Sequence, residues 1–224
     1  MKGSDETSLD RQLDPPELSD AALQHVGRFN HLWASGCQVQ PLVVVVGGTA
    51  GVGKSTLARA LTQFVPAFYV IPTSLIRTLL RATQPGDPLH FQHTYELTLE
   101  EFVRQSRAVM SIVQQLIAFT RTEKQLYVIE GSNVIPGVLG DVNGVDLVEV
   151  YLEVPSQSRH RTMVAGPTHN RALGEAEFAA CRAIQSFLVG EARARGKPVL
   201  DSDRALACTM SLLEERLSRR ELST

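Results

Sequence analysis

The chain has 224 residues, a length that favours one α/β domain with at most a short appendage and supports a sizeable buried core. Hydrophobic residues make up 43% and charged residues 21%, which excludes a disordered or collagen-like chain. Lys and Arg total 22 against 24 Asp and Glu, and the resulting formal charge of -2 argues against a dedicated nucleic-acid-binding protein.

The sequence also bears on the compartment. Its longest purely aliphatic run, Leu42 to Val46, is far shorter than the roughly 20 residues that a membrane-spanning helix needs, so no membrane association is expected. The first residues are polar and mostly acidic and lack the apolar segment of a secretory signal. The three cysteines form no CxxC pair, which argues against a disulfide framework or a zinc site. These features predict a cytoplasmic protein.

The predicted elements alternate between helix and strand. A polar, acidic composition predicts a flexible tail over residues 1–17, and residues 18–36 then hold a helix that packs on the main domain, residues 37–224. The β-branched run PLVVVVGG reads as a parallel strand buried on both faces at the centre of a sheet. The remaining pattern predicts strands over 67–72, 125–131, 145–154 and 197–201, with helices over 54–64, 74–82, 175–195 and 204–220 and a long helix after the loop at 83–88. The alternation predicts an α/β fold with a doubly wound parallel sheet.

The segment GGTAGVGKST matches the phosphate-binding pattern G-x-x-x-x-G-K-[ST] between a strand and a helix. Glycines let successive backbone N–H groups point at phosphate oxygens, and the helix N-terminus adds its positive dipole end. Lys54 would bridge the β- and γ-phosphates, and the Ser55 hydroxyl would coordinate Mg²⁺. The expected ATP-binding residues are Gly48, Thr49, Ala50, Gly51, Val52, Gly53, Lys54, Ser55 and Thr56.

Four further segments stand in register with this loop: VIPTSLIRTLLRA, DPLHFQHTY, VIEGSNVIPG and FAACRAIQSFLVGEARARGKPVLDS. Over about residues 42–203 the chain resembles the 2-phosphoglycerate kinase family, and more loosely the small adenylate-kinase-like P-loop kinases. The resemblance implies a P-loop NTPase fold, a five-stranded parallel sheet flanked by helices, and a lid over about residues 155–174. It also implies a Mg²⁺- and ATP-dependent kinase that transfers the γ-phosphoryl group to a small acidic or phosphorylated metabolite.

The resemblance places the acceptor contacts after the second strand and in the loop before the long helix. The family segment STDxIR reads PTSLIR here, so Ser74 stands where an acidic residue would contact the acceptor hydroxyl. Arg77 and Arg81 share a helix face and could bind a substrate phosphate or carboxylate, although Arg81 could equally belong to a solvated basic surface. His93 and Tyr95 are further substrate candidates that could as easily serve turns and packing.

Three residues are candidates for the chemistry itself, beside Lys54. Glu130, at the end of the third strand, could hold a Mg²⁺-bound water or act as a base, or could only cap the next loop. Arg161 and Arg171 in the lid would stabilise charge on the transferring group, although the family pattern HxxRF is kept only in part and an exposed basic loop is the alternative. The segment DSDR after the fifth strand is expected to line the adenine pocket.

Ser74 leaves a second function open, a nucleotide-binding regulatory protein that has lost phosphoryl transfer. An NTPase that drives a partner protein is less favoured because no sensor or oligomer-interface motif is evident. The sequence therefore predicts a small-molecule substrate and no nucleic-acid partner, and it leaves oligomer formation open.

Overall fold

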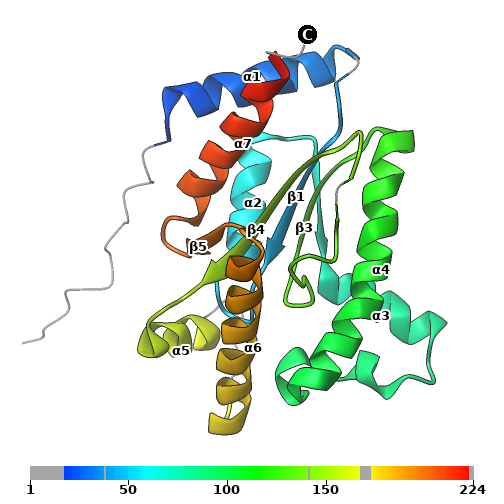
Figure 1. Cartoon of the computed structure of the whole chain (residues 1–224), viewed down its shortest axis with the longest axis vertical. Helices are drawn as coiled ribbons and strands as arrows, with labels where there is room; N and C mark the ends of the chain where they lie inside the picture. The colour runs from blue at the N-terminus through cyan, green and yellow to red at the C-terminus, as the bar shows by residue number, and fades with distance from the viewer. Residues whose placement is uncertain (1–17, 38, 141, 167–172, 222–224) are drawn as a thin grey trace, which may run out of the picture.

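The computed structural model describes residues 18–37, 39–140, 142–166 and 173–221. The predicted tail at residues 1–17 and the candidate Arg171 lie outside this range. The described residues form one five-stranded sheet in the order β2-β3-β1-β4-β5 with all neighbours parallel (Figure 1). The strands are β1 (Leu42–Gly47), β2 (Phe68–Pro72), β3 (Leu126–Gly131), β4 (Asp146–Glu153) and β5 (Val199–Asp201). The predicted α/β fold and the central position of the first strand are confirmed.

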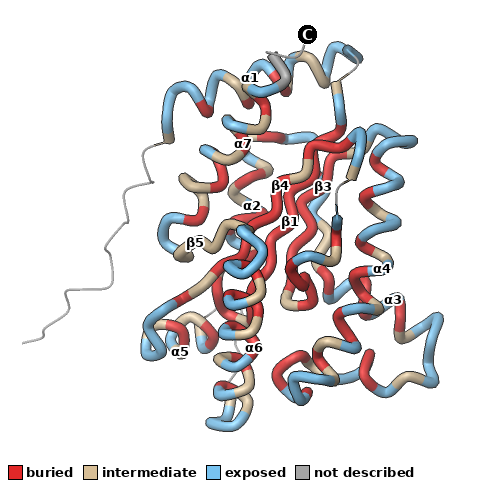
Figure 2. The backbone as a smooth tube through the Cα atoms, in the orientation of Figure 1, coloured by how far each residue is buried: buried red, intermediate tan, exposed pale blue. Residues whose placement is uncertain are grey.

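Helices cover both faces of the sheet. Because the side chains of β1 alternate, Val44 and Val46 face one layer and Val43 and Val45 the other. The first layer contains α1, α2 and α7, and the second contains α3, α4 and α6. The three central strands β3, β1 and β4 form the buried centre (Figure 2). The helices are α1 (Asp20–Ala34), α2 (Lys54–Phe64), α3 (Thr73–Thr83), α4 (Leu99–Glu123), α5 (Gln157–Ala165), α6 (Glu175–Ala194) and α7 (Ala205–Glu221).

Local sequence explains where the helices begin. The Ser19 side chain accepts a hydrogen bond from the backbone N–H of Ala22 at 3.0 Å and so caps α1. Thr98 and Glu101 form a reciprocal capping box at the start of α4. The Ser19 hydroxyl also donates to Glu214 of α7 at 2.9 Å. The predicted N-terminal helix therefore packs on the main domain, where it joins the layer of α2 and α7.

Two regions differ in detail from the prediction. The expected lid contains α5, which the sequence pattern did not indicate, because only His160 and Val164 of this helix are buried and they make too narrow a stripe. The loop before α4 contains two short 3₁₀ helices, η1 (Pro88–Phe91) and η2 (Thr94–Glu96). Both corrections concern segments that flank the end of the sheet toward which the strands run.

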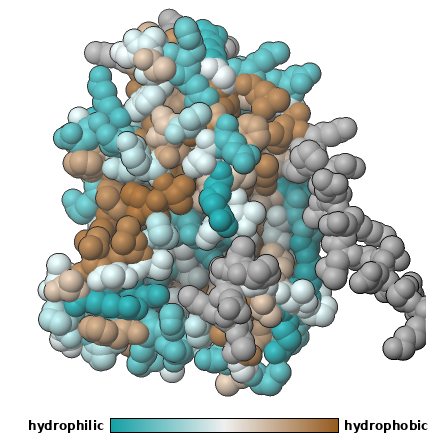
Figure 3. Space-filling model, turned by 180° about the vertical axis from the view of Figure 1, so that it is seen from behind, coloured by the Kyte–Doolittle hydropathy of each residue, from teal (hydrophilic) through white to brown (hydrophobic). Residues whose placement is uncertain are grey.

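The surface is mixed. Viewed from behind, apolar side chains gather in patches among hydrophilic ones (Figure 3). The large exposed apolar side chains include Tyr69 on the edge strand β2 and Leu75 and Leu79 on the adjoining α3. None of the described helices is both long enough and apolar enough to cross a membrane.

Candidate active site

The phosphate-binding loop joins β1 to α2. Gly48, Gly51 and Gly53 adopt positive φ values of 145°, 78° and 88°, which side chains rarely tolerate. At Gly51 an added Cβ would also lie 2.3 Å from Val164 Cγ2 of α5. The loop thus needs glycine for both its backbone conformation and its contact with α5. Its curled backbone ends at the N-terminus of α2, which is the arrangement that binds phosphate groups.

Lys54 and Ser55 occupy the first positions of α2 and face two different partners. The Lys54 ammonium is almost fully buried and donates to the Thr49 carbonyl at 2.6 Å, across the loop. The Ser55 hydroxyl donates to Glu130 Oε1 at 2.8 Å. Register explains the second contact, because Glu130 on β3 pairs with Val46 near the end of β1. Ser55 and Glu130, which are 75 residues apart in sequence, therefore meet at the ends of two central strands.

These groups line a cavity of about 130 Å³ at the carboxyl ends of β1, β2 and β3. β3 and α3 pack closely at Gly131, where an added Cβ would lie 1.6 Å from Thr73 Oγ1 at the start of α3. A side chain at position 131 would therefore push α3 away from β3. The cavity is lined by Ala50, Lys54, Ser55, Pro72, Thr73, Ser74, Arg77, His93, Thr94, Glu130, Gly131, Ser132 and Asn133.

The predicted acceptor residues divide into two groups. Ser74, Arg77 and His93 line the cavity, with Arg77 almost fully buried one helical turn after the exposed Ser74. Tyr95 is buried and stacks on His93 with ring centroids 5.1 Å apart, but it is not part of the lining. Arg81 also lies outside the lining.

The side chain of Arg81 turns toward the loop before α4. Its Nε donates to the His90 carbonyl at 2.5 Å, and its guanidinium lies 5.7 Å from the centre of the Phe91 ring. These contacts hold η1 against α3, and they account for Arg81 without a substrate. Arg77 therefore lines the cavity and Arg81 does not, and a substrate contact of Arg81 stays a prediction.

The predicted ATP-binding residues of the loop differ in whether they line the cavity. Ala50 lines the cavity, whereas Val52 is fully buried in the core beneath the loop and Thr56 is exposed outside the lining. Thr49 is fully buried. For Val52, any contact with a phosphate would come from the backbone N–H group.

Of the two predicted lid arginines, the structure describes Arg161, which does not line the cavity. Arg161 forms an ion pair with Glu175 at 2.7 Å, and its guanidinium lies 4.2 Å from the centre of the Phe178 ring. Its position on α5 against α6 leaves its role toward a phosphoryl group a prediction. Arg171 is not among the described residues.

The neighbouring His160 does reach the phosphate-binding loop. Its Nε2 lies 2.7 Å from the carbonyl oxygen of Ala50, and Arg182 approaches its Nδ1 at 3.5 Å. Burial lowers the pKa of His160 below its ordinary value, opposed by the hydrogen bond to Ala50, and the positive charges of Arg182 and Lys54 lower it further. A neutral imidazole that donates from Nε2 fits these surroundings, so α5 supports the loop through one hydrogen bond.

The turn after β5 also adjoins the loop. An added Cβ on Gly53 would lie 3.9 Å from Ser202 Cβ. Arg159 of α5 reaches the same turn, where it donates to the Ser202 hydroxyl at 3.3 Å and to Asp203. The expected position of DSDR near a bound nucleotide is consistent with this geometry, but an adenine contact stays a prediction.

The residues fit Mg²⁺ bound together with phosphates rather than a metal held by protein alone. Ser55 and Glu130 bring two oxygen ligands of the kind that Mg²⁺ prefers to within 2.8 Å of each other. Within the described ranges, no three His, Cys, Asp or Glu residues cluster as a metal site. Mg²⁺ commonly keeps several waters and binds one or two protein groups plus substrate phosphates, and this pair suits that mode.

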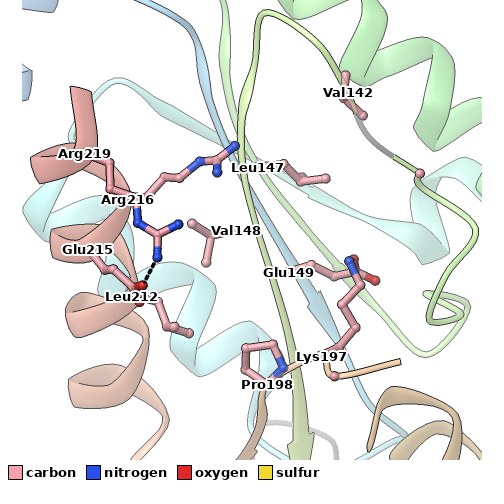
Figure 4. Close-up of a pocket in the computed structure, with 12 residues that line it drawn as sticks. Val142, Leu147, Val148, Glu149, Lys197, Pro198, Leu212, Glu215, Arg216 and Arg219 are labelled. Carbon is pink, nitrogen blue, oxygen red and sulfur yellow. Dashed lines mark hydrogen bonds and ion pairs between the residues drawn. The ribbon is translucent and has the colours of Figure 1, made fainter. Parts of the chain in front are cut away.

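A second cavity, of about 450 Å³, lies beside the N-terminal half of β4, where α7 and residues 196–198 form its walls (Figure 4). Its charges are already matched. Lys197 contacts the buried Glu149 at 2.8 Å, Arg216 contacts Asp146 at 3.1 Å, and Arg219 pairs with Glu215. Although larger than the first cavity, it does not adjoin the glycine-rich loop, so its contacts read as structural.

Asn133 and His160 are two functional candidates that the sequence interpretation did not select, and the cavity lining adds Pro72, Thr73, Thr94, Gly131 and Ser132. Asn133 falls in the segment VIEGSNVIPG, three residues after Glu130, so its place in that segment was the available signal. His160 stands between Arg159 and Arg161 in the expected lid, with nothing local to set it apart. The partners of both residues come from other elements.

Comparison with known proteins tests the predicted resemblance. No protein-family model matches the chain. A 2-phosphoglycerate kinase of Methanocaldococcus jannaschii is 26% identical over 209 residues, which cover 83% of this chain and 67% of that protein. A 2-phosphoglycerate kinase of Methanococcus vannielii is 24% identical over 196 residues, covering 76% of this chain and 63% of that protein. The chain thus spans about two thirds of the length of these curated relatives.

A solved structure supports the fold. Shikimate kinase from Acinetobacter baumannii, in complex with shikimate, superposes with a TM-score of 0.50 at 18% identity and covers 83% of this chain and 98% of that chain. This likeness concerns the fold alone, and it agrees with the parallel sheet and the loop after β1. The parallel sheet with the glycine-rich loop after β1 is a P-loop NTPase fold, and in sequence the chain is similar to 2-phosphoglycerate kinases.

Proposed function

We propose that the protein transfers the γ-phosphoryl group of Mg²⁺-bound ATP to a hydroxyl of a small acidic or phosphorylated metabolite, with 2-phosphoglycerate as the first candidate. One observation carries the proposal: Lys54 and Ser55 of the phosphate-binding loop line the same cavity as Arg77 of α3. A nucleotide bound along the loop would present its terminal phosphate to this cavity. A substrate anion on Arg77 would then lie beside it.

In the proposed step, the acceptor hydroxyl oxygen forms a bond to the γ-phosphorus while the bond from that phosphorus to the β,γ-bridging oxygen breaks. ADP leaves with the bonding electron pair, and the hydroxyl proton passes to Glu130 or to water. The Mg²⁺ ion, when bound, neutralises charge on the β- and γ-phosphates. The transition state is loose, so most of the catalytic effect comes from positioning and charge neutralisation rather than from a strong base.

Each described residue has a defined task in this proposal. Lys54 exchanges its bond to the Thr49 carbonyl for contacts to the phosphates. Arg77, which is almost fully buried at the cavity wall, binds the substrate phosphate or carboxylate through its planar guanidinium. Ser55 and Glu130 together orient the metal ion and its waters. Arg161 and Arg171 remain candidates for a lid contribution.

One observation favours a second candidate function, that of a regulatory protein that binds nucleotide without transferring phosphate. Ser74 lines the cavity at the start of α3, at the position where the resemblance to 2-phosphoglycerate kinases implies an acidic residue. A serine there accepts and donates hydrogen bonds but is a much weaker base than a carboxylate. Because the transition state is loose, we expect this change to slow transfer rather than abolish it.

Phosphorus-31 NMR with Mg²⁺-ATP and 2-phosphoglycerate tests the proposal directly. A new phosphoester resonance, with equimolar loss of the ATP γ-signal and appearance of ADP, is the expected result. Controls omit the acceptor or use Lys54→Ala. Nucleotide binding without any new phosphoester, for 2-phosphoglycerate and for a set of small hydroxy acids and phosphosugars, would instead support the regulatory function.

Restoring the acidic residue separates the two candidates further. If the protein is a degenerate kinase, Ser74→Asp should create or raise transfer to 2-phosphoglycerate. If Ser74 suits a different acceptor, the same change should lower transfer to that acceptor. Ser74→Asn is the matched control, because it has similar volume but no carboxylate charge.

A further inference from the structure

A buried amide network fixes one wall of the cavity. Asn133, which is 1% exposed, follows β3 and lines the cavity. Its Nδ2 donates to Gln105 Oε1 at 2.8 Å and to Ser106 Oγ at 3.0 Å, both on α4. Gln105 Nε2 in turn donates to the carbonyl oxygens of Leu89 at 2.5 Å and Gln92 at 3.2 Å.

This chain of hydrogen bonds determines which way each amide points. Two backbone carbonyls can only accept, so the group of Gln105 that faces them must be its NH₂. The Oε1 of Gln105 must then face Asn133 and accept from its Nδ2. Both N–H bonds of Asn133 are thereby directed at α4, and no donor in the described part of the chain bonds to its Oδ1.

We propose that Asn133 Oδ1 accepts a hydrogen bond from the hydroxyl group of the substrate that receives the phosphoryl group. The inference rests on the proposed kinase function and adds the residue that selects for a hydroxyl. Other polar groups that line the cavity, including Lys54, Arg77 and Thr94, carry donors suited to anions. Glu130 already accepts from Ser55 through Oε1. Asn133 supplies a neutral acceptor that cannot rotate to become a donor.

A fixed acceptor discriminates in both directions. Before transfer, a substrate hydroxyl donates to Oδ1 and so aims its oxygen lone pairs elsewhere, toward the incoming phosphorus. As the bond to phosphorus forms, its proton leaves Oδ1 for Glu130 or water. A carboxylate or phosphate in the same place would meet Oδ1 with its own oxygens and be disfavoured, which prevents an anionic substrate from binding in the reverse orientation. A residue with this role touches the substrate, so it belongs to the specificity of the reaction rather than to the support of the fold.

Two ligands that differ only in the hydroxyl test the proposal. 2-Phosphoglycerate has one free hydroxyl, and 2-phospholactate is the same molecule without it. Their dissociation constants are measured by calorimetry for the whole protein and for Asn133→Ala, with a non-hydrolysable ATP analogue and Mg²⁺ present. We expect Asn133→Ala to weaken 2-phosphoglycerate by about tenfold, the cost of one buried hydrogen bond, and to leave 2-phospholactate unchanged.

The matched control is Ser106→Ala, which removes one partner of the same amide but leaves Gln105 to hold its orientation. Both ligands should then bind as they do to the unmodified protein. If Asn133→Ala does not fold, Gln105→Met serves in its place. That change keeps a similar side-chain volume and frees the Asn133 amide to rotate, so a smaller loss confined to 2-phosphoglycerate is expected.

The outcomes separate this inference from the proposed function. Equal weakening of both ligands would assign Asn133 a structural role and overturn the inference, as would no change in either, and in both cases the kinase proposal stands. If the unmodified protein binds neither ligand and phosphorylates no 2-phosphoglycerate, the proposed substrate falls and the inference falls with it. Selective loss of 2-phosphoglycerate supports both.

Discussion

The two cavities differ in the partners of the charged side chains that line them. Beside β4, the buried carboxylate of Glu149 accepts a hydrogen bond from Tyr151 at 2.6 Å and forms an ion pair with Lys197. Each of its two oxygens therefore contacts a protein group. Burial, and then the negative charge of Glu149, raise the pKa of Tyr151 far above its usual range, which keeps the phenol protonated as a donor. At the loop, Lys54 donates to a backbone carbonyl and Ser55 donates to a carboxylate, and a ligand can replace both of these contacts.

The contrast follows from strand direction. In a parallel sheet the carboxyl ends of the strands and the N-termini of the following helices meet at one end, where backbone donors point outward. The loop cavity lies at that end, between α3 and the loop that leads into α2. The β4 cavity lies toward the other end, where α7 supplies paired arginines. Size is therefore the wrong guide to the active site here, and the exchangeability of polar contacts is the better one.

The largest expected effect separates Lys54, which is almost fully buried, from Lys197, which is partly exposed. Lys54→Ala should lower kcat/KM for phosphoryl transfer by about 1000-fold, because it removes a charge that stabilises the transferring group. Lys197→Ala, the matched control in the β4 cavity, should change kcat/KM by less than about twofold. Steady-state kinetics at saturating Mg²⁺ measures both. Comparable losses in the two variants would contradict the division between the cavities.

A smaller effect is expected on the acceptor side. Arg77→Ala should raise the KM for the acid substrate by about 30-fold or more while leaving the KM for ATP nearly unchanged, because a bidentate charged contact is lost only to the acceptor. Arg81→Ala is the control one helical turn later, and its KM values should stay within about threefold. Kinetics with each substrate varied in turn gives the answer. A rise in the KM for ATP alone would move Arg77 to the nucleotide.

Lys197→Ala, which should leave activity nearly unchanged, should lower the free energy of unfolding. Lys197→Ala leaves the carboxylate of Glu149 buried with only Tyr151 as partner, so we expect a loss of about 2 kcal/mol in the free energy of unfolding. Lys197→Ala with Glu149→Gln should recover most of that loss. Urea denaturation measures both variants. No loss in the single variant would show that the ion pair is not a structural contact.

The smallest effect concerns pH. The pKa of His160 is lower in the folded protein than its unfolded value near 6.5, so below that pH the unfolded chain binds the extra proton and folding must release it. Stability is therefore full above pH 6.5 and falls as the pH drops toward the folded pKa. Between pH 7.5 and 5.5 we expect a loss of about 1 kcal/mol that His160→Gln, which retains a donor for Ala50, does not show. Denaturation at several pH values compares the two proteins. An equal pH dependence in both would place the titrating group elsewhere.

Much of the fold could be predicted because its signals are local. The β-branched run of β1 predicts a buried strand, and the glycines that follow it predict a phosphate-binding loop. The predicted helix over 54–64 coincides with α2. The helix α5 escaped prediction because only two of its residues, His160 and Val164, are buried, and both contact the phosphate-binding loop rather than forming a broad apolar stripe. Its local sequence does not distinguish a helix from a basic loop.

The site divides along the same line. Lys54 and Ser55 could be predicted from one short pattern, and Glu130 from its place at a strand end. Helical spacing alone does not distinguish Arg77 from Arg81. Of the two, only Arg77 lines the cavity, because Arg81 donates to the backbone of η1 instead. Asn133 depends on a hydrogen bond to Gln105, which is 28 residues away along the chain. Such a contact exists only after α4 and β3 have packed.

The bond from Lys54 to the Thr49 carbonyl has a thermodynamic consequence for nucleotide entry. The loop already holds its curled shape through its own lysine, so binding replaces one contact with another and orders little additional backbone. We therefore expect nucleotide association to carry a small conformational entropy cost and to be limited by the encounter rather than by folding of the loop. Hydrogen exchange of the loop amides before and after nucleotide addition would register that difference as a modest change in protection.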